Sequence, residues 1–353
     1  MRLGLGVPIR GLADVASVIT GDLKPHTRQL YNNLIEGHRA SLAQAITLVE
    51  STLKESKQES AKLLTILTKS SNHLTAQNTF RIGLTGPPGA GKSTFIETFG
   101  TRLTEEGHRV AVLAVDPSSS RRGGGGSLLG DKTRMTELSR NPNAFIRPSP
   151  SRGHLGGVAR TTNESILLCE AGGYDIIIVE TVGVGQSEHI VTDMVDALCL
   201  ILSPGGGDEL QGIKRGIIEQ CDLVLINKCD GDLIPAANRT KAEYTSALKF
   251  IQPKCSLWRT KVMKMSSRTL EGVDEVWSTL QDFKQTMIGG HEFGRRRAEQ
   301  QKAWLWHYIN QRLLEVASWM HFQLEYVALN LQRFRPSCST KVFSNSGHHL
   351  RDW

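Results

Sequence analysis

The hydrophobic positions follow two different patterns along the chain. From His26 to about Leu74, apolar residues recur three, four or eight positions apart, as they do on one face of an amphipathic helix. From Phe80 onward, short apolar runs alternate with helical stretches. We therefore expect a helical N-terminal extension followed by an α/β domain.

Short apolar runs predict the strands of that domain, and their alternation with helices predicts a doubly wound, mostly parallel sheet with helices on both faces. Ligands of such sheets bind beyond the carboxyl ends of the strands, so functional residues should directly follow the runs. The predicted strands are Phe80–Thr85, Arg109–Val115, Tyr174–Val179, Ala197–Leu202, Leu223–Ile226 and Val262–Met265.

The domain organisation follows from these patterns. Residues 1–24 are a targeting or disordered segment, 25–78 the helical extension, 79–290 the α/β domain, 291–316 a C-terminal helix and 317–353 a tail. Arg2 and Arg10, with no acidic residue in 1–13, resemble a transit peptide, but acidic residues soon follow and serine is scarce. Both interpretations of the first segment stay open.

Composition and charge exclude some classes of protein. No apolar run approaches the length of a membrane span, so we expect neither an integral membrane protein nor a membrane partner. The formal net charge is +7, but lysine and arginine are scattered rather than gathered in one block. A basic surface suits anionic nucleotides equally well, and we expect no nucleic-acid partner. The six cysteines form no C-x-x-C pair and are interpreted as reduced, mostly structural thiols.

A glycine-rich motif follows the first predicted strand. Its glycines let backbone N–H groups face phosphate oxygens, its lysine reaches the β- and γ-phosphates, and its serine hydroxyl coordinates magnesium. The strand before it and the helical run after it are the context that a P-loop demands, which favours a P-loop over an ordinary glycine-rich turn. The predicted phosphate-binding residues are Gly86, Pro87, Pro88, Gly89, Ala90, Gly91, Lys92, Ser93 and Thr94.

An acidic residue closes the apolar run that ends at Val179. The sequence there is Glu180-Thr181-Val182-Gly183. A carboxylate at this strand end can hold magnesium directly or through water, and the Gly183 N–H can sense the γ-phosphate. The alternative is an acidic strand end before a flexible turn, but the P-loop upstream favours a switch loop.

A third motif concerns the base. Asn227-Lys228-Cys229-Asp230 follows the run Leu223–Ile226. The Asp230 carboxylate can accept hydrogen bonds from guanine N1–H and N2–H₂, an edge that adenine does not present, while Lys228 can lie along the ring. Ser266, Ser267 and Arg268 are placed to offer backbone donors to the guanine oxygen. Alone the motif could be a polar turn; after a P-loop and a switch glycine it predicts GTP rather than ATP.

These motifs and their surroundings resemble the MeaB/ArgK family of GTPases, and most of all its member from animal mitochondria. Members of the family resemble metallochaperone GTPases in fold; they escort adenosylcobalamin into methylmalonyl-CoA mutase and protect that enzyme. The resemblance covers roughly residues 25 to 316 and is carried by Arg81–Gly100, Leu113–Pro117, Gly130–Met135, Thr161–Ser187 and Gly207–Gly216.

The resemblance implies a GTP-hydrolysing chaperone that binds GTP or GDP with Mg²⁺. Its partner would be methylmalonyl-CoA mutase, and adenosylcobalamin would be reached only through that partner. It implies the mitochondrial matrix as location, or otherwise the cytoplasm. It also implies that Asp116 and Asp131 lie near the magnesium, alongside Ser93 and Glu180; a helix or turn cap is the alternative for Asp116.

The resemblance also bears on catalysis. The segment 207–215 matches a family switch that responds to the mutase, which makes Lys214 a catalytic candidate beside Lys92 and Gly183; a solvated lysine is the alternative. Ras-like enzymes orient the attacking water with a glutamine directly after the switch glycine, but Val184 stands there in this chain. We therefore expect slow intrinsic hydrolysis that the mutase accelerates.

The chain departs from the family pattern in two places. The loop between Ser119 and Ser127 is about two residues longer and contains the run Gly123–Gly126, which is costly to order and bears on how Asp131 reaches magnesium. The likeness stops near Val316, although family members dimerise through their C-terminal arm. We expect a weakened or absent family homodimer and a poorly ordered end after about Arg333.

Other functions share parts of this pattern. A metal-insertion GTPase would share the fold but usually carries a His-rich or Cys-rich tract, and this sequence has none. A small-molecule kinase would keep the P-loop but has no use for the base-reading motif. A nucleotide-binding scaffold that no longer hydrolyses would keep Lys92 and Asp230, and it stays open as an alternative.

Overall fold

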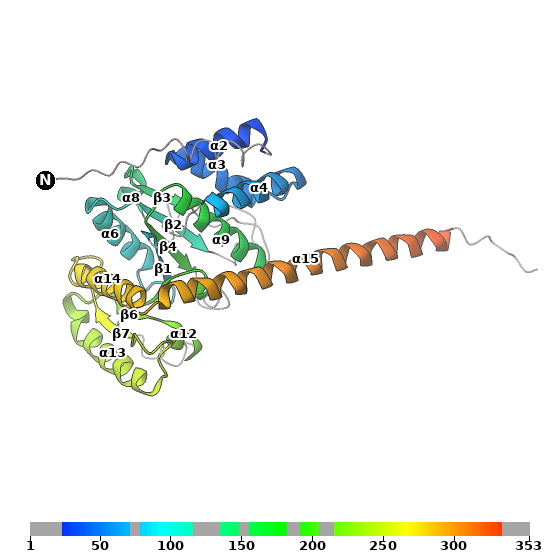
Figure 1. Cartoon of the computed structure of the whole chain (residues 1–353). Helices are drawn as coiled ribbons and strands as arrows, with labels where there is room; N and C mark the ends of the chain where they lie inside the picture. The colour runs from blue at the N-terminus through cyan, green and yellow to red at the C-terminus, as the bar shows by residue number, and fades with distance from the viewer. Residues whose placement is uncertain are drawn as a thin grey trace, which may run out of the picture. The chain divides into compact units, whose positions relative to one another are not determined.

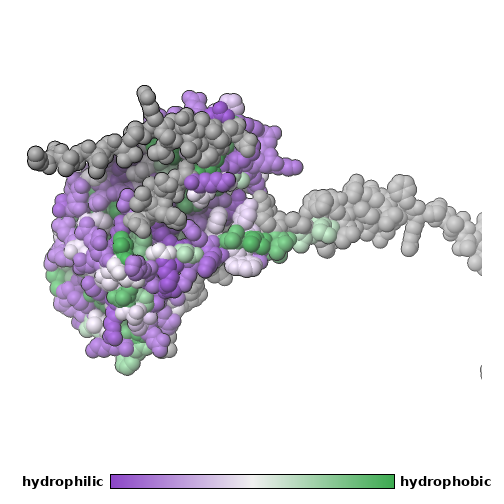
Figure 2. Space-filling view, in the orientation of Figure 1, coloured by the Kyte–Doolittle hydropathy of each residue, from purple (hydrophilic) through white to green (hydrophobic). Residues whose placement is uncertain are grey.

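The computed structural model describes residues 23–70, 78–115, 135–147, 155–181, 191–204 and 215–333. The chain divides into two compact units, Met1–Leu305 and Trp306–Trp353. The first unit contains the whole α/β domain (Figure 1). The visible face of this unit is mainly hydrophilic, with small scattered hydrophobic patches (Figure 2).

One sheet of seven strands organises the first unit, in the order β3-β2-β4-β1-β5-β6-β7, and all neighbouring pairs are parallel. The predicted doubly wound parallel sheet is therefore confirmed. The strands are β1 (Phe80–Thr85), β2 (Val110–Val115), β3 (Ala144–Arg147), β4 (Ile176–Thr181), β5 (Ala197–Leu202), β6 (Leu223–Ile226) and β7 (Lys261–Lys264). The six predicted strands are present within two residues of their predicted ends, whereas β3 was not predicted from the sequence.

Helices cover both faces of the sheet, and each face has its own hydrophobic core. Successive strand residues point to opposite faces, so Val110 and Val112 join one core while Ala111 and Leu113 join the other. The first core includes residues of α6 (Lys92–Glu105), α8 (Thr136–Arg140) and α14 (Val273–Gly289). The second includes residues of α9 (Leu155–Ala171), α12 (Arg215–Gln220) and α13 (Ile234–Ala247).

Three N-terminal helices join the second core, and they account for the helical pattern that begins at His26. They are α2 (Pro25–Ile35), α3 (Arg39–Glu50) and α4 (Lys54–Ser70). Their apolar faces are fully buried at Leu34, Leu42, Ile46 and Leu63. The helices pack on one another and on α9, so they extend the domain on that face.

Buried ion pairs with α15 (Glu292–Arg333) close the sheet at the amino ends of its strands, which we call the amino edge. Asp196 directly precedes β5 and accepts two hydrogen bonds from the Arg297 guanidinium, at 2.7 and 2.6 Å. Asp222 directly precedes β6 and lies 3.2 Å from Arg296. Arg81 and Glu170 form a further two-bond pair at 2.8 and 2.9 Å. The start of α15 is thereby fixed to the first unit.

The C-terminal helix is longer than the sequence pattern indicated. It continues past residue 316, where we placed its end, to Arg333. Helix-forming residues dominate this stretch, and the next proline is Pro336. The rest of the predicted tail, and residues 1–22, lie outside the described residues.

The described cysteines are free thiols. Burial raises the pKa of the Cys169, Cys199 and Cys221 thiols, which keeps them protonated and inert. They therefore behave as the structural thiols that their sequence context indicated. Within the described residues, none of the helices combines the length and apolar composition that crossing a bilayer requires.

Candidate nucleotide site

The loops after β1, β4, β6 and β7 carry most of the predicted site residues. Because the strands are parallel, these loops all emerge at the carboxyl edge of the sheet. β1 lies beside β4 on one side and β5 on the other, and β6 is the next strand along. The phosphate-binding, magnesium and base-reading candidates are therefore grouped at one edge, opposite the ion pairs of α15.

The P-loop runs from Gly86 into the first turn of α6. Its tip, at Pro88 and Gly89, is exposed, whereas Ala90 is buried and donates its N–H to the Pro87 carbonyl at 3.3 Å. Thr94, on the first turn of the helix, is exposed. The tip of the loop and the start of the helix are therefore at the surface.

Two positions of the P-loop require glycine, because other protein atoms lie very close to the backbone there. A Cβ atom at Gly86 would lie 2.1 Å from the carbonyl oxygen of Ile201, on β5. A Cβ atom at Gly91 would lie 2.4 Å from Nδ2 of the Asn227 side chain. Both glycines also have positive φ angles, +146° and +93°. Side chains at either position would therefore push the loop away from β5 or from the base-reading loop.

The start of α6 is electropositive. The helix begins without a side-chain cap and without an acidic residue in its first turn. Its first N–H groups have no partner within the helix, and the helix dipole adds partial positive charge there. Lys92 is buried and donates from Nζ to the carbonyl oxygens of Gly86 and Pro87, at 2.8 and 3.2 Å. The loop therefore presents N–H donors and an ammonium group around one point, as phosphate binding requires.

A serine and a buried glutamate form the magnesium candidate. Ser93 Oγ donates to Glu180 Oε1 at 3.3 Å, which joins the start of α6 to the end of β4. Glu180 is only 4% exposed. A hydroxyl and a carboxylate are the oxygen ligands that Mg²⁺ prefers, and this ion usually keeps several waters as well. The two residues therefore fit a magnesium ion beside the P-loop.

Two threonines that motif reasoning missed support this corner of the site. Thr181, the last residue of β4, donates its hydroxyl to Thr85 Oγ1 at 3.1 Å, and both residues are fully buried. Each follows an apolar strand and directly precedes a functional loop. The contact ties the strand end that carries Glu180 to the strand end that begins the P-loop.

Asn227, the first residue of the base-reading motif, connects two loops of the site. It is 1% exposed, so its amide lies inside the protein. Its Nδ2 donates to the Ala90 carbonyl at 3.0 Å, and its Oδ1 accepts from the backbone N–H and the hydroxyl of Ser267, at 3.0 and 2.9 Å. The side chain thus connects the P-loop to the loop after β7. It positions both loops.

The base-reading candidates lie next to this connection. Asp230 is half-buried, and its Oδ2 accepts a hydrogen bond from Ser266 Oγ at 2.5 Å. Lys228 is exposed and has a positive φ of 58°, which is uncommon for a residue with a side chain. This backbone turn directs Asn227 inward while Lys228 stays at the surface.

The backbone N–H groups of Ser266, Ser267 and Arg268 all have acceptors within the protein. The N–H groups donate in turn to the Glu271 carbonyl at 2.9 Å, to Asn227 Oδ1 at 3.0 Å and to Ser266 Oγ at 3.2 Å. Donation to a guanine oxygen, as we expected from the sequence, would therefore require one N–H to exchange its acceptor. The longest of these contacts is that of Arg268.

Four predicted site residues lie outside the described residues. They are the magnesium candidates Asp116 and Asp131, the switch glycine Gly183 and the catalytic candidate Lys214. The Gly123–Gly126 run lies outside them as well. The structure brings together the P-loop, Ser93, Glu180 and the two base-reading loops.

A parallel doubly wound sheet with a P-loop after β1 and an Asn-Lys-x-Asp motif after β6 defines a P-loop GTPase. The family described as "Methylmalonyl Co-A mutase-associated GTPase MeaB" matches residues 42–320. The chain belongs to this MeaB family, which confirms the resemblance stated from its motifs.

Named relatives agree with this assignment. The chain is 57% identical over 292 residues to the "Methylmalonic aciduria type A homolog, mitochondrial" of Mus musculus, covering 81% of this chain and 70% of that protein. It is 48% identical over 272 residues to "GTPase ArgK" of Escherichia coli, covering 77% and 80%. A solved structure described as a LAO/AO transport system kinase has a TM-score of 0.70 and 36% identity, covering 88% of this chain and 93% of that one.

Proposed function

We propose that this GTPase is a chaperone that supports the loading of adenosylcobalamin into methylmalonyl-CoA mutase and protects that enzyme. The family description names a mutase-associated GTPase, and the match covers most of the chain. That match carries the mutase part of the proposal, and the Asn227 connection carries the GTPase part, because it joins the phosphate-binding loop to the base-reading loop in one site. Cobalamin would be reached only through the mutase.

Each site residue receives a defined task in this proposal. The N–H groups of the P-loop and the Lys92 ammonium bind the phosphates, and Asp230 reads the guanine edge beside Lys228. Ser93 and Glu180 hold Mg²⁺, which would neutralise charge on the β- and γ-phosphates. Water attacks the γ-phosphorus, the bond to the β–γ bridging oxygen breaks, and inorganic phosphate and GDP leave.

The residues outside the described part complete the proposal. Asp116 and Asp131 would join the magnesium ligands, and the Gly183 N–H would sense the γ-phosphate. Lys214 would supply positive charge to the transition state when the mutase orders the segment 207–215, as an arginine finger does. The family homodimer is weakened because the likeness in the C-terminal arm stops near residue 316.

The cellular location of this chain is proposed from the names of its relatives. Those from Mus musculus and Caenorhabditis elegans are named mitochondrial, whereas Escherichia coli is a bacterium without that compartment. We propose the mitochondrial matrix for this chain, with the cytoplasm as the alternative. Fluorescence microscopy of the chain fused at its C-terminus to a fluorescent protein tests the assignment.

Phosphate release with and without mutase tests the function. We expect slow intrinsic hydrolysis of GTP that rises when methylmalonyl-CoA mutase is added, and recovery of the mutase when the protein is pulled down with GTP or GDP. A Lys214→Ala variant should bind GTP normally but lose the stimulation. Full stimulation of this variant would remove Lys214 from the mechanism. GTP binding with no turnover in either condition would instead identify a non-hydrolysing scaffold.

A further inference from the structure

The outer edge of β7 has a groove that the nucleotide site does not use. β7 ends the sheet, and in the described part of the chain no strand pairs with its outer side. Two cavities, of about 380 and 340 Å³, lie along this strand and share Lys241, Val262 and Met263 among their lining residues. We call the two together the β7 groove.

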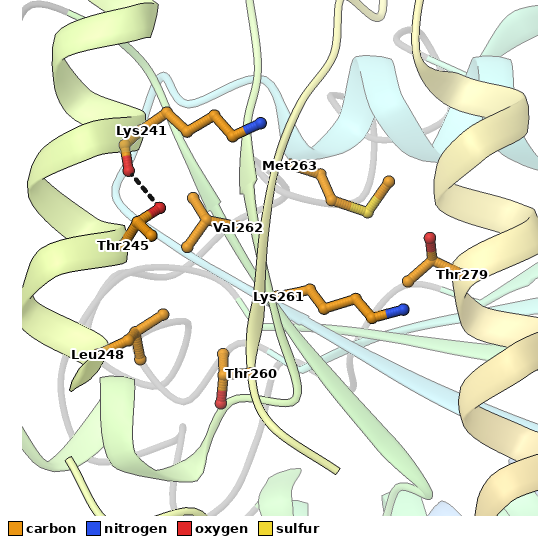
Figure 3. Close-up of a pocket in the computed structure, with 8 residues that line it drawn as sticks. All are labelled: Lys241, Thr245, Leu248, Thr260, Lys261, Val262, Met263 and Thr279. Atoms are coloured by element: carbon orange, nitrogen blue, oxygen red, sulfur yellow. Dashed lines mark hydrogen bonds between the residues drawn. The ribbon is translucent and has the colours of Figure 1, made fainter.

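Two helices form the walls of the β7 groove. Figure 3 shows Lys241 and Thr245 of α13, with Leu248 directly after that helix, on one side of β7 and Thr279 of α14 on the other. The Val262 side chain points toward α13, whereas Met263 points toward α14, as the alternation along a strand requires. The groove therefore has an apolar surface on both sides of an open strand edge.

The floor of the β7 groove offers backbone hydrogen-bonding groups. The N–H of Lys261 donates to the Asp222 carbonyl at 3.4 Å and that of Met265 to the Ile226 carbonyl at 2.8 Å, so these residues face β6. Alternate residues of a parallel strand face opposite neighbours. Val262 and Lys264 consequently direct their backbone groups toward the outer edge, where an added strand could pair with them.

The charge of the β7 groove selects the chemistry of what binds there. The two charged residues that line the larger cavity are both lysines, Lys241 and Lys261. Lys264, in the smaller cavity, donates to the Asn238 amide oxygen at 2.6 Å, and the Lys261 ammonium lies 4.4 Å from the centre of the Trp258 ring. Both contacts are with neutral groups. Glu271 and Glu275 also line the smaller cavity, so carboxylates are attracted to Lys241 and Lys261 at the larger cavity.

We propose that the β7 groove binds an extended acidic peptide segment of a partner protein, which adds to the sheet as a further strand beside β7. Its backbone pairs with Val262 and Lys264, its carboxylates approach Lys241 and Lys261 at the larger cavity, and its apolar side chains contact Leu248 and Met263. A second copy of this chain is a poor occupant, because lysines on a short edge strand repel their own copies. The proposal does not depend on the mutase partnership.

Fluorescence anisotropy on the full chain tests the proposal with a labelled hexapeptide, acetyl-(Glu-Val)₃-amide, against acetyl-(Lys-Val)₃-amide. We expect the acidic peptide to bind, the basic one not to bind, and added salt to weaken binding. Lys241→Glu together with Lys261→Glu reverses both charges of the larger cavity and should lower affinity about tenfold. The matched control, Lys54→Glu with Lys69→Glu, reverses two exposed lysines of α4 and should change nothing.

Two N-methylated versions of the acidic peptide, blocked on alternate sets of amides, test the strand pairing. In an added strand only one set faces β7, so one version should lose binding and the other should keep it. Equal binding of both versions would show attraction by charge without strand addition and would overturn the proposal. Equal weakening by the α4 control, absence of acidic-peptide binding, or a concentration-dependent dimer through this edge would overturn it as well.

Discussion

At the amino edge of the sheet, Asp196 and Asp222 are paired with arginines of α15, whereas at the carboxyl edge the Lys92 ammonium is held by two carbonyl oxygens of its own loop. The first arrangement joins full charges in two-bond geometry and buries them. The second surrounds a cation with neutral dipoles and helix N–H groups. A polyanion can add to the second arrangement but has no place in the first.

The comparison separates stability from function on one sheet. Charged residues next to the strands contribute to stability at one edge and to function at the other. The two edges differ in which groups of the chain pair with those charged residues. At the amino edge the partner is α15, which reaches back from far along the sequence. At the carboxyl edge, the glycines Gly86 and Gly91 let the P-loop lie close to β5 and to Asn227, and the partner of Lys92 is the backbone of that loop. Variants at the two edges should therefore fail in different ways.

The largest effect is expected at the amino edge. Arg297→Met leaves the buried Asp196 without its two-bond partner, and breaking such a pair costs about 3–5 kcal/mol. Urea unfolding followed by tryptophan fluorescence should show this loss, while the folded fraction still binds GTP. Arg295→Met is the matched control, because the neighbouring Arg295 is exposed and should change stability little. Equal midpoints for both variants would contradict the structural role of the buried pair.

The next effect is expected at the carboxyl edge. Lys92→Ala removes the ammonium from the P-loop, and GTP hydrolysis should fall by at least about 100-fold, as when a charge-stabilising donor is lost. Thermal unfolding should change far less than hydrolysis, because the Gly86 and Pro87 carbonyls that accept from Lys92 belong to the same loop. Lys69→Ala, an exposed lysine on α4, serves as control. A Lys92→Ala protein that hydrolyses normally would remove the P-loop assignment.

A smaller loss is expected for base recognition. Asp230→Asn keeps the size of the side chain but replaces a carboxylate acceptor with an amide, so GTP should lose about 2 kcal/mol of its preference over ATP. Isothermal titration calorimetry with both nucleotides measures the difference. Asp232→Asn, two residues further and exposed, is the control. Unchanged GTP binding in Asp230→Asn would show that another group reads the base.

The same comparison shows what the sequence could predict. The functional residues at the carboxyl edge could be predicted, because each functional loop is a local motif directly after an apolar strand, as at β1 and β6. The ion pairs at the amino edge could not be predicted, because Arg297 and Asp196 lie 101 residues apart and neither has a local signal. Asn227 is an intermediate case: its motif was found, but its inward direction depends on the turn at Lys228, which periodicity does not encode.

The smallest expected effect concerns pH at the amino edge. Lys284, on α14, donates to the Asn78 carbonyl at 3.4 Å. Burial lowers its pKa, and Arg297 lowers it further, although Asp196 and Asp175 act in the opposite direction. Because the folded pKa lies below the unfolded value of 10.5, the unfolded chain binds more protons in the interval between them. Stability from this group should therefore rise as pH increases through that interval.

Lys284→Met should remove this alkaline rise, an effect below about 1 kcal/mol for a partly exposed group. The measurement is urea unfolding at several pH values from neutral to alkaline, read as the difference between variant and unchanged protein, so that the contributions of other titratable groups, such as the buried cysteines, cancel. Lys302→Met, an exposed lysine of α15, should give no pH-dependent difference. If Lys284→Met and Lys302→Met respond alike, burial at the amino edge does not lower the pKa of Lys284 in the folded protein.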